Sequence, residues 1–266
     1  MTFRTIFGAA VLLGGVGLGA AQAEIASHRA AYTLSLGQAK TSSGITSISG
    51  AMIIDWQESC EGWTLSQRMR FQLADGEGSA IDTDLIFSSW EASDGLGYRF
   101  TMRTVRDGEL AEELRGRAEL DGPDKGGKAT FTIPAGTVMS LPAGTMFPTV
   151  HTLLLIERAR AGEVTLSRVV FDGSDADGPL EVNAIIGPKV TPPKIDSPKI
   201  APIANRPGWR VRMAFFKPSS NSGEPDYETG MLLLDNGVAR DFTFEYSDFS
   251  IKAKLDRLEA LPKPKC

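Results

Sequence analysis

Cysteine and histidine are scarce in this chain of 266 residues, which contains two of each. The two imidazoles, His28 and His151, stand in no local catalytic pattern, and we interpret His151 as a packed or capping residue of a helix. The sequence also has no G-x-S-x-G nucleophile elbow, no H-E-x-x-H zinc helix and no paired-cysteine metal knuckle. It therefore predicts a protein that is not an enzyme, with no catalytic residue, no cofactor and no metal site.

An excess of basic residues is missing as well, because 28 Lys and Arg face 33 Asp and Glu and the net charge is −5. Proteins that bind nucleic acid neutralise phosphates with a basic face, so nucleic acid is not an expected partner. Outside the N-terminus, no stretch approaches the roughly 20 consecutive apolar residues of a membrane-spanning helix. We expect a chain that does not span the membrane, and we expect it to be a monomer.

The N-terminal segment has the parts of a secretory signal. Arg4 precedes an apolar run that extends to Leu18, and residues 21–23 form an A-x-A cleavage site before Glu24. Residues 1–23 are thus predicted to be a signal peptide that is cleaved after Ala23. The mature protein is predicted to lie in the bacterial periplasm.

The two cysteines, Cys60 and Cys266, would then meet an oxidising compartment, where a lone pair is normally a structural disulfide. Closing a loop of about 200 residues removes roughly 5 kcal/mol of unfolded-chain entropy, which favours the bridge. The alternative is that Cys266 stays free or pairs with another molecule while Cys60 is simply buried. We expect the intramolecular disulfide.

Alternation of apolar and polar residues, typical of a strand with one buried face, recurs along most of the chain. In residues 63–73, for example, Trp63, Met69 and Phe71 point one way and Arg68 points the other. About fourteen such strands are separated by Asp-Gly and Asn-Gly turns, as in antiparallel hairpins. Sheets of that many strands curl or close. The predicted fold is therefore mainly β, with a single antiparallel rolled or spiral-like sheet that forms a partly open barrel.

Two segments depart from this regular spacing. After Ser247-Asp248 the alternation changes phase, which predicts a bulge or tight turn. The aspartate-rich residues 172–178 lack the first aspartate and last glutamate of an EF-hand, so we interpret them as a hairpin turn. Residues 24–266 are predicted to form one domain.

One helix is expected among the strands. Pro148 at its start, an apolar cluster that includes Leu154, and Gly162 at its end predict about 12–15 helical residues packed inside the sheet. The proline-rich residues 187–208 cannot pair as a central strand, so we expect an extended loop inserted in a hairpin.

Aromatic residues are the remaining unusual feature, with 13 Phe and 4 Trp. They can form an ordinary core, or they can line an apolar pocket large enough for a lipid. A curled sheet of about fourteen strands encloses more volume than one short helix fills. We therefore expect a ligand cavity with walls formed by Trp63, Met69, Phe71, Met213 and Phe215.

Three short segments of the chain resemble a known family. They are Cys60-Glu61-Gly62-Trp63, Ser89-Trp90-Glu91-Ala92-Ser93-Asp94-Gly95 and Gly144-Thr145-Met146-Phe147-Pro148-Thr149. With them the chain resembles the EipB-type cell-envelope-integrity family of alphaproteobacteria, from His28 to Cys266. The resemblance implies a periplasmic spiral-like sheet wrapped around a helix, similar to the half-barrels of lipoprotein carriers. It also implies a non-enzymatic role in envelope integrity and a disulfide that Cys60 and Cys266 match.

Two functions remain open. The protein is either a binding module that holds a lipid, an acylated lipoprotein or a peptide segment in a concave apolar cavity, or an interaction module. The latter would dock a periplasmic envelope protein through loops such as residues 187–208 or through sheet edges. A deep apolar cavity would favour the first, and a filled interior would favour the second.

Overall fold

The computed structural model describes residues 24–198, 200–217 and 223–266, and within them the chain forms one 15-stranded sheet. The signal peptide expected at residues 1–23 lies outside the described residues. The first eight strands are β1 His28–Ala39, β2 Ile45–Ser59, β3 Gly62–Asp75, β4 Ala80–Ala92, β5 Gly97–Arg106, β6 Glu109–Leu120, β7 Gly127–Ile133 and β8 Val138–Leu141. After β9 (Thr145–Met146) come helix α1 Pro148–Arg160, β10 Thr165–Val170, β11 Leu180–Val190, helix α2 Ala201–Ala204, β12 Gly208–Phe216, β13 Tyr227–Leu234, β14 Ala239–Glu245 and β15 Phe249–Ala260.

Every neighbouring pair in the sheet is antiparallel except β9 with β10. Strand β1 pairs with both β2 and β15, so the first and last strands lie side by side and β8 and β9 form the edges. The mainly β, rolled sheet predicted from the sequence is confirmed, with one strand more than the expected number of about fourteen. The expected phase change after Ser247 is the tight β14–β15 turn, closed by the Tyr246 amide bonded to the Phe249 carbonyl.

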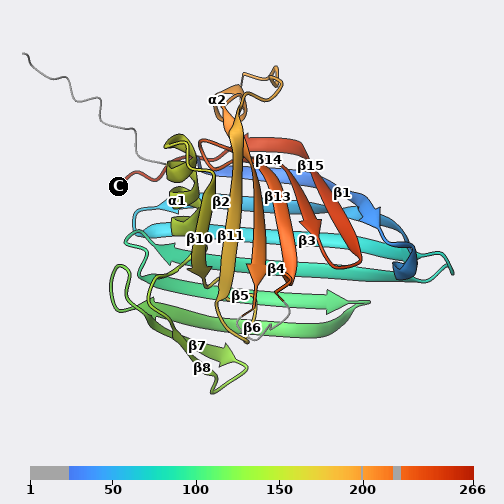
Figure 1. Ribbon diagram of the computed structural model, residues 1–266, viewed down its shortest axis with the longest axis horizontal. Coiled ribbons are helices and arrows are strands. Elements are labelled where there is room, and N and C mark those ends of the chain that lie inside the picture. Colours follow the sequence, from blue (N-terminus) through green and yellow to red (C-terminus); the bar gives the residue numbers. More distant parts are fainter. Residues whose placement is uncertain (1–23, 199, 218–222) are drawn as a thin grey trace, which may run out of the picture.

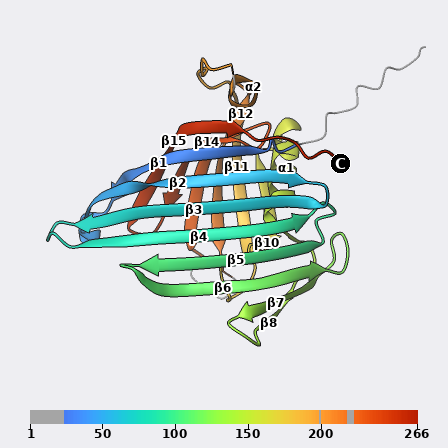
Figure 2. The same cartoon turned by 180° about the vertical axis from the view of Figure 1, so that it is seen from behind.

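The sheet folds back on itself, so that β1–β8 form one layer and β10–β15 cross it as a second (Figures 1 and 2). Inward-facing residues of both layers form the largest core cluster, which includes Tyr32, Met52 and Met69 from the first layer and Leu234 and Ile251 from the second. Burial of these apolar faces is what holds the layers together.

Helix α1 begins at Pro148 and ends before Gly162, as the sequence predicts. It lies beside β10 at one opening of the roll (Figures 1 and 2). Leu155 and Ile156 are fully buried against β10–β13, whereas Leu154 is only half-buried. The helix therefore closes that opening, and Leu155 and Ile156 carry more of its packing than Leu154.

The proline-rich segment differs from the expected extended loop of residues 187–208. Residues 187–190 belong to β11, where Lys189 and Val190 pair with β12 beyond a register shift. The pairing tolerates Pro188 because this residue lies within the irregularity, where its missing N–H is not needed. We call the remaining residues, 191–198 and 200–207, the strap.

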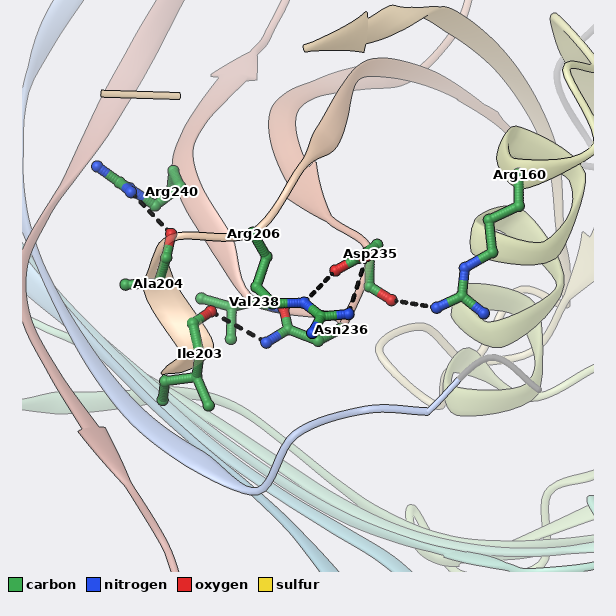
Figure 3. A network of polar contacts seen from close by, with 8 residues as sticks. All are labelled: Arg160, Ile203, Ala204, Arg206, Asp235, Asn236, Val238 and Arg240. Atoms are coloured by element: carbon green, nitrogen blue, oxygen red, sulfur yellow. Dashed lines mark hydrogen bonds and ion pairs between the residues drawn. The ribbon is translucent and has the colours of Figure 1, made fainter. Parts of the chain in front are cut away.

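Polar contacts fasten the strap to the β13–β14 turn (Figure 3). Arg206 forms two hydrogen bonds with the Asp235 carboxylate, at 2.7 and 3.0 Å, and Asn236 donates to the Ile203 carbonyl at 3.0 Å. Arg160, at the end of α1, donates to the Asp235 carbonyl at 2.8 Å. The turn thus joins the strap to the helix.

The strap is also part of the hydrophobic core. Ala204 is fully buried, and Ile195, Ile200 and Ile203 pack against the main cluster. The Asn205 side chain bonds to both the amide and the carbonyl of Ile195, at 2.7 and 2.9 Å, which holds the strap in its folded form. These contacts make the strap a cover of the core rather than a free arm.

Cys60 and Cys266 form a disulfide with a Cα–Cα distance of 5.6 Å. Cys60 lies in the β2–β3 turn, so the bridge attaches the C-terminal end of the chain to the first layer of the sheet. The C-terminus lies toward the end of the roll where α1 is found (Figure 1).

Candidate functional site

An apolar cavity of about 620 Å³ lies between the two layers of the sheet. Its position is near the β3–β4 hairpin, away from the opening closed by α1 (Figure 1). Leu73 and Ile81 of that hairpin line it, and Ile81 and Tyr246 are 45% and 42% exposed. The cavity therefore opens to solvent through a mouth that presents large apolar side chains.

The register of β3, β4 and β5 places the side chains of the first wall. Phe71 lies opposite Thr83, and Leu85 lies opposite Thr104. These residues alternate with outward-facing polar ones, so the strand period alone turns them toward the interior. Met102 completes this wall and packs against a second core cluster, so the cavity lies where two clusters meet.

The opposite wall comes from the end of the chain. Phe249 and Ile251 of β15 line the cavity, and the ring of Phe249 lies 5.1 Å from that of Tyr246. Ser174, in the loop after β10, supplies a hydroxyl from the other end of the second layer. Phe71 of β3 and Phe249 of β15 therefore line the same cavity because the sheet is rolled.

Polar groups lie among the apolar side chains of this cavity. Thr83 and Thr104 are buried within it, while Arg106 and Glu112 lie among its lining residues with exposed side chains. An apolar wall with a small number of polar anchors is typical of small-molecule sites, which commonly enclose roughly 300–1,000 Å³. The arrangement suits an apolar chain that carries a polar head.

The five residues expected to line a cavity lie in different places. Phe71 lines the cavity, and Met69, two residues earlier, is buried in the adjoining core. Met213 and Phe215 pack against another cluster on β10 and β11, where Phe215 stacks on Tyr227 with ring centroids 4.3 Å apart. Half-buried Trp63 lies near the other end of β3 and is not among the residues lining the cavity. The structure brings only part of the set together.

Glu91 is a buried functional group that the sequence reasoning missed. It lies on β4, is 1% exposed, and accepts the amide protons of Thr149 at 2.7 Å and Val150 at 2.8 Å. The N-cap residue Phe147 has no side-chain acceptor, so Glu91 satisfies the first turn of α1 from another element. A lone acid between Trp and Ala, together with a helix that lacks a polar cap, was the available signal.

Burial raises the pKa of Glu91 from 4.5 to about 7, although the two amide hydrogen bonds oppose the rise.

The turn that follows β4 also leaves room for the helix, because Gly95 has a φ of 71° and a Cβ there would come within 2.8 Å of the Val150 side chain. The Trp-Glu-Ala-Ser-Asp-Gly segment, residues 90–95, thus contacts and supports the first turn of α1.

The remaining sequence candidates have structural contacts. His151 is a buried residue of α1, as expected, and burial together with the charge of Arg168 lowers its pKa to about 4. The aspartate-rich turn of residues 172–178 is joined to the second layer by ion pairs, since Lys217 contacts both Asp175 and Asp177.

Among the described residues, no helix has the length and apolar character needed to cross a membrane.

Comparison with known proteins gives consistent matches. The family model described as EipB-like matches residues 19–262. The chain is 33% identical over 250 residues to the cell envelope integrity protein EipB of Brucella abortus (strain 2308), covering 92% of this chain and 88% of that protein. It is also similar to a crystal structure from Brucella abortus, titled a beta-barrel-like protein of domain of unknown function DUF1849. That similarity has a TM-score of 0.83 and 31% identity, and it covers 90% of this chain and 100% of the other.

Proposed function

The chain belongs to the EipB-like family, and from this premise we propose that it is a non-enzymatic periplasmic protein that supports cell-envelope integrity. In this proposal it binds a lipid-like or acylated ligand in the apolar cavity and does not transform it. Residues 1–23 direct secretion and are removed, and residues 24–266 act as one folded unit. The observation that carries the binding role is the open apolar cavity of about 620 Å³.

Hydrophobic burial supplies the binding energy in this mechanism. About ten CH₂ groups buried against Phe71, Leu85 and Ile251 contribute about 8 kcal/mol. Association costs about 4 kcal/mol or more, which leaves about 4 kcal/mol or less from burial alone and corresponds to a Kd of about 1 mM or weaker. Arg106 at the mouth can pair with an anionic head group, and the exposed apolar side chains of Ile81 and Tyr246 offer the entering chain its first contacts.

A fluorescence titration tests the binding role. A dansyl-labelled fatty acid should bind saturably to the disulfide-bonded protein and be displaced by unlabelled palmitate. Phe71→Glu should abolish the signal, because it buries an unpaired charge in the wall. Gln72→Glu is the matched control, since it adds the same charge one residue further, where the side chain points outward and is exposed.

A second variant protects the test against misfolding. Ile81→Trp narrows the mouth at a position that is 45% exposed, so it should weaken binding without disturbing the core. Circular dichroism and melting curves report whether each variant is folded. If folded wild-type protein shows no saturable uptake, the cavity proposal fails.

The alternative function is an interaction module that docks an envelope partner through sheet edges or loops. The edge strand β8, where Val138 is 65% exposed, favours the sheet-edge version. The strap is less suited to docking, because Arg206, Asn236 and buried Ala204 hold it on the core. Absence of acyl binding would make the β8 edge the first surface to alter.

A further inference from the structure

A second concave site lies on the outer face of the sheet, where β4–β7 form a groove of about 720 Å³. Tyr98 and Leu114, which precede the lining residues Arg99 and Arg115 along their strands, point to the opposite face and are buried in the core. The groove is therefore separated from the inner cavity by the thickness of the sheet. Neither the family resemblance nor the proposed acyl binding assigns it a role.

Strand register builds the groove from two rows of side chains. Trp90 on β4 lies opposite Arg99 on β5, which lies opposite Arg117 on β6. In the next row, Thr101 lies opposite Arg115. The pairing of three rigid strands thus fixes one indole and three guanidinium groups on one surface.

The positive charge of this groove is poorly neutralised. Arg99 lies over the Trp90 ring, 4.8 Å from its centroid, and forms no ion pair with the described residues. Among the described residues, the only ion-pair partners of Arg115 and Arg117 are Glu113 and Glu119, at 4.0 and 3.9 Å. None of the described residues that line the groove is acidic.

Several other exposed arginines of the sheet are paired much more closely. Arg68 and Asp84 form two hydrogen bonds, at 2.9 and 2.6 Å, and Arg212 contacts Glu228 at 2.7 Å. The net charge of the chain is −5, so a cluster of three loosely paired arginines stands out against an acidic protein. Such a cluster attracts anions and can bind carboxylate or phosphate groups with two hydrogen bonds each.

The uncharged residues that line the groove limit the class of ligand that it can bind. Ser88, Thr101 and Thr130 present hydroxyl groups beside the arginines, and no aliphatic side chain lines the described part of the groove. The rings of Trp90 and Phe100 supply the apolar part of the lining. An acyl chain would leave the arginines and hydroxyls without partners, whereas a sugar can place its C–H face on Trp90 and exchange hydrogen bonds with the hydroxyls. We propose that this groove binds an anionic saccharide, with its acidic group held by Arg99, Arg115 and Arg117.

Isothermal titration calorimetry with an oligogalacturonate, a carboxylated sugar oligomer, tests the proposal on the full mature protein. Saturable binding is expected, and the double variant Arg99→Ala/Arg117→Ala should weaken it by roughly tenfold or more. The matched control is Arg103→Ala, which removes the same charge from an exposed position on β5 that does not line the groove. That control should bind like the wild type.

Three further ligands distinguish the alternatives. A neutral malto-oligosaccharide, hexaglutamate and phosphatidylglycerol vesicles should each bind more weakly than the oligogalacturonate. Equal binding of hexaglutamate or of the vesicles would overturn the saccharide assignment in favour of an acidic peptide or a membrane surface. An equal loss in Arg103→Ala, or no binding at all, would also refute the proposal. Phe71→Glu should leave this binding unchanged, because the inner cavity is a separate site.

Discussion

Replacing Glu91 by glutamine tests how a buried carboxyl supports helix α1. The wild-type carboxyl accepts the amide protons of Thr149 at 2.7 Å and Val150 at 2.8 Å. A glutamine side chain has a single acceptor oxygen, so one of these two buried N–H groups loses its partner. We expect the variant to be less stable by about 1–3 kcal/mol in weakly acidic solution.

The same substitution should change how stability depends on pH. Burial raises the folded-state pKa of Glu91 from 4.5 to about 7, so its contribution is fully present below pH 4.5 and is lost as the pH rises through about 7. At about 1.36 kcal/mol per pH unit, this contribution is about 3 kcal/mol. The wild type should therefore lose about that much of its unfolding free energy, relative to Glu91→Gln, between about pH 4.5 and pH 8.

His151 titrates in the opposite sense and must be separated from this effect. Burial, with the charge of Arg168 second, lowers its pKa to about 4, so its contribution is present above pH 6.5 and is lost as the pH falls toward 4. Wild type and Glu91→Gln both retain His151, so its contribution cancels in the difference between them. The individual stability curves can look flat, whereas their difference should not.

Urea denaturation followed by tryptophan fluorescence, at several pH values from about 5 to 8, measures this difference. Carbon-13 NMR of the Glu91 carboxyl gives its pKa directly. A stability difference that stays constant over this range, or a carboxyl signal that titrates near its ordinary value of 4.5, would refute the reasoning.

Three further predictions concern the closure of the fold. Reduction of the Cys60–Cys266 disulfide should lower the unfolding free energy by roughly 5 kcal/mol, measured by urea denaturation with and without reductant; an unchanged midpoint would contradict the proposed role of the bridge. Leu155→Asp should cost several kcal/mol and Leu154→Asp clearly less, since only the former side chain is fully buried; equal melting temperatures would show that the helix face is wrongly placed. Ala204→Asp should release the strap and make it sensitive to limited proteolysis, and unchanged resistance would show that the strap is held by its polar contacts alone.

Local patterns made much of the fold predictable. Residues 63–73 alternate with the period of a strand, and Met69 is buried while Arg68 is exposed. Pro148 and Gly162 marked the helix correctly, because a fixed φ suits its first turn and a φ of 81° suits glycine after its end. Residues 187–208 were misjudged at their start, where β11 continues through a local irregularity that composition does not reveal.

The candidate site was less predictable than the strands. Alternation places Phe71 on the inward face of β3, where it lines the cavity, but the same argument selects Met213 and Phe215, which pack against the cluster on β10 and β11 and are not among the lining residues. Strand alternation tells which side of the sheet a residue faces. It does not tell which residues from the other layer lie across from it.

The sequence by itself determined most of the strands, the helix and the family, because each depends on short-range pattern or on matching residues. Only the tertiary structure decided how β1 closes against β15, how Glu91 comes to support a helix almost sixty residues later, and where the two layers leave a cavity. Those features arise when packing brings distant segments together. The free energy of folding that stabilises them comes from contacts formed across the whole roll rather than from any one stretch of chain.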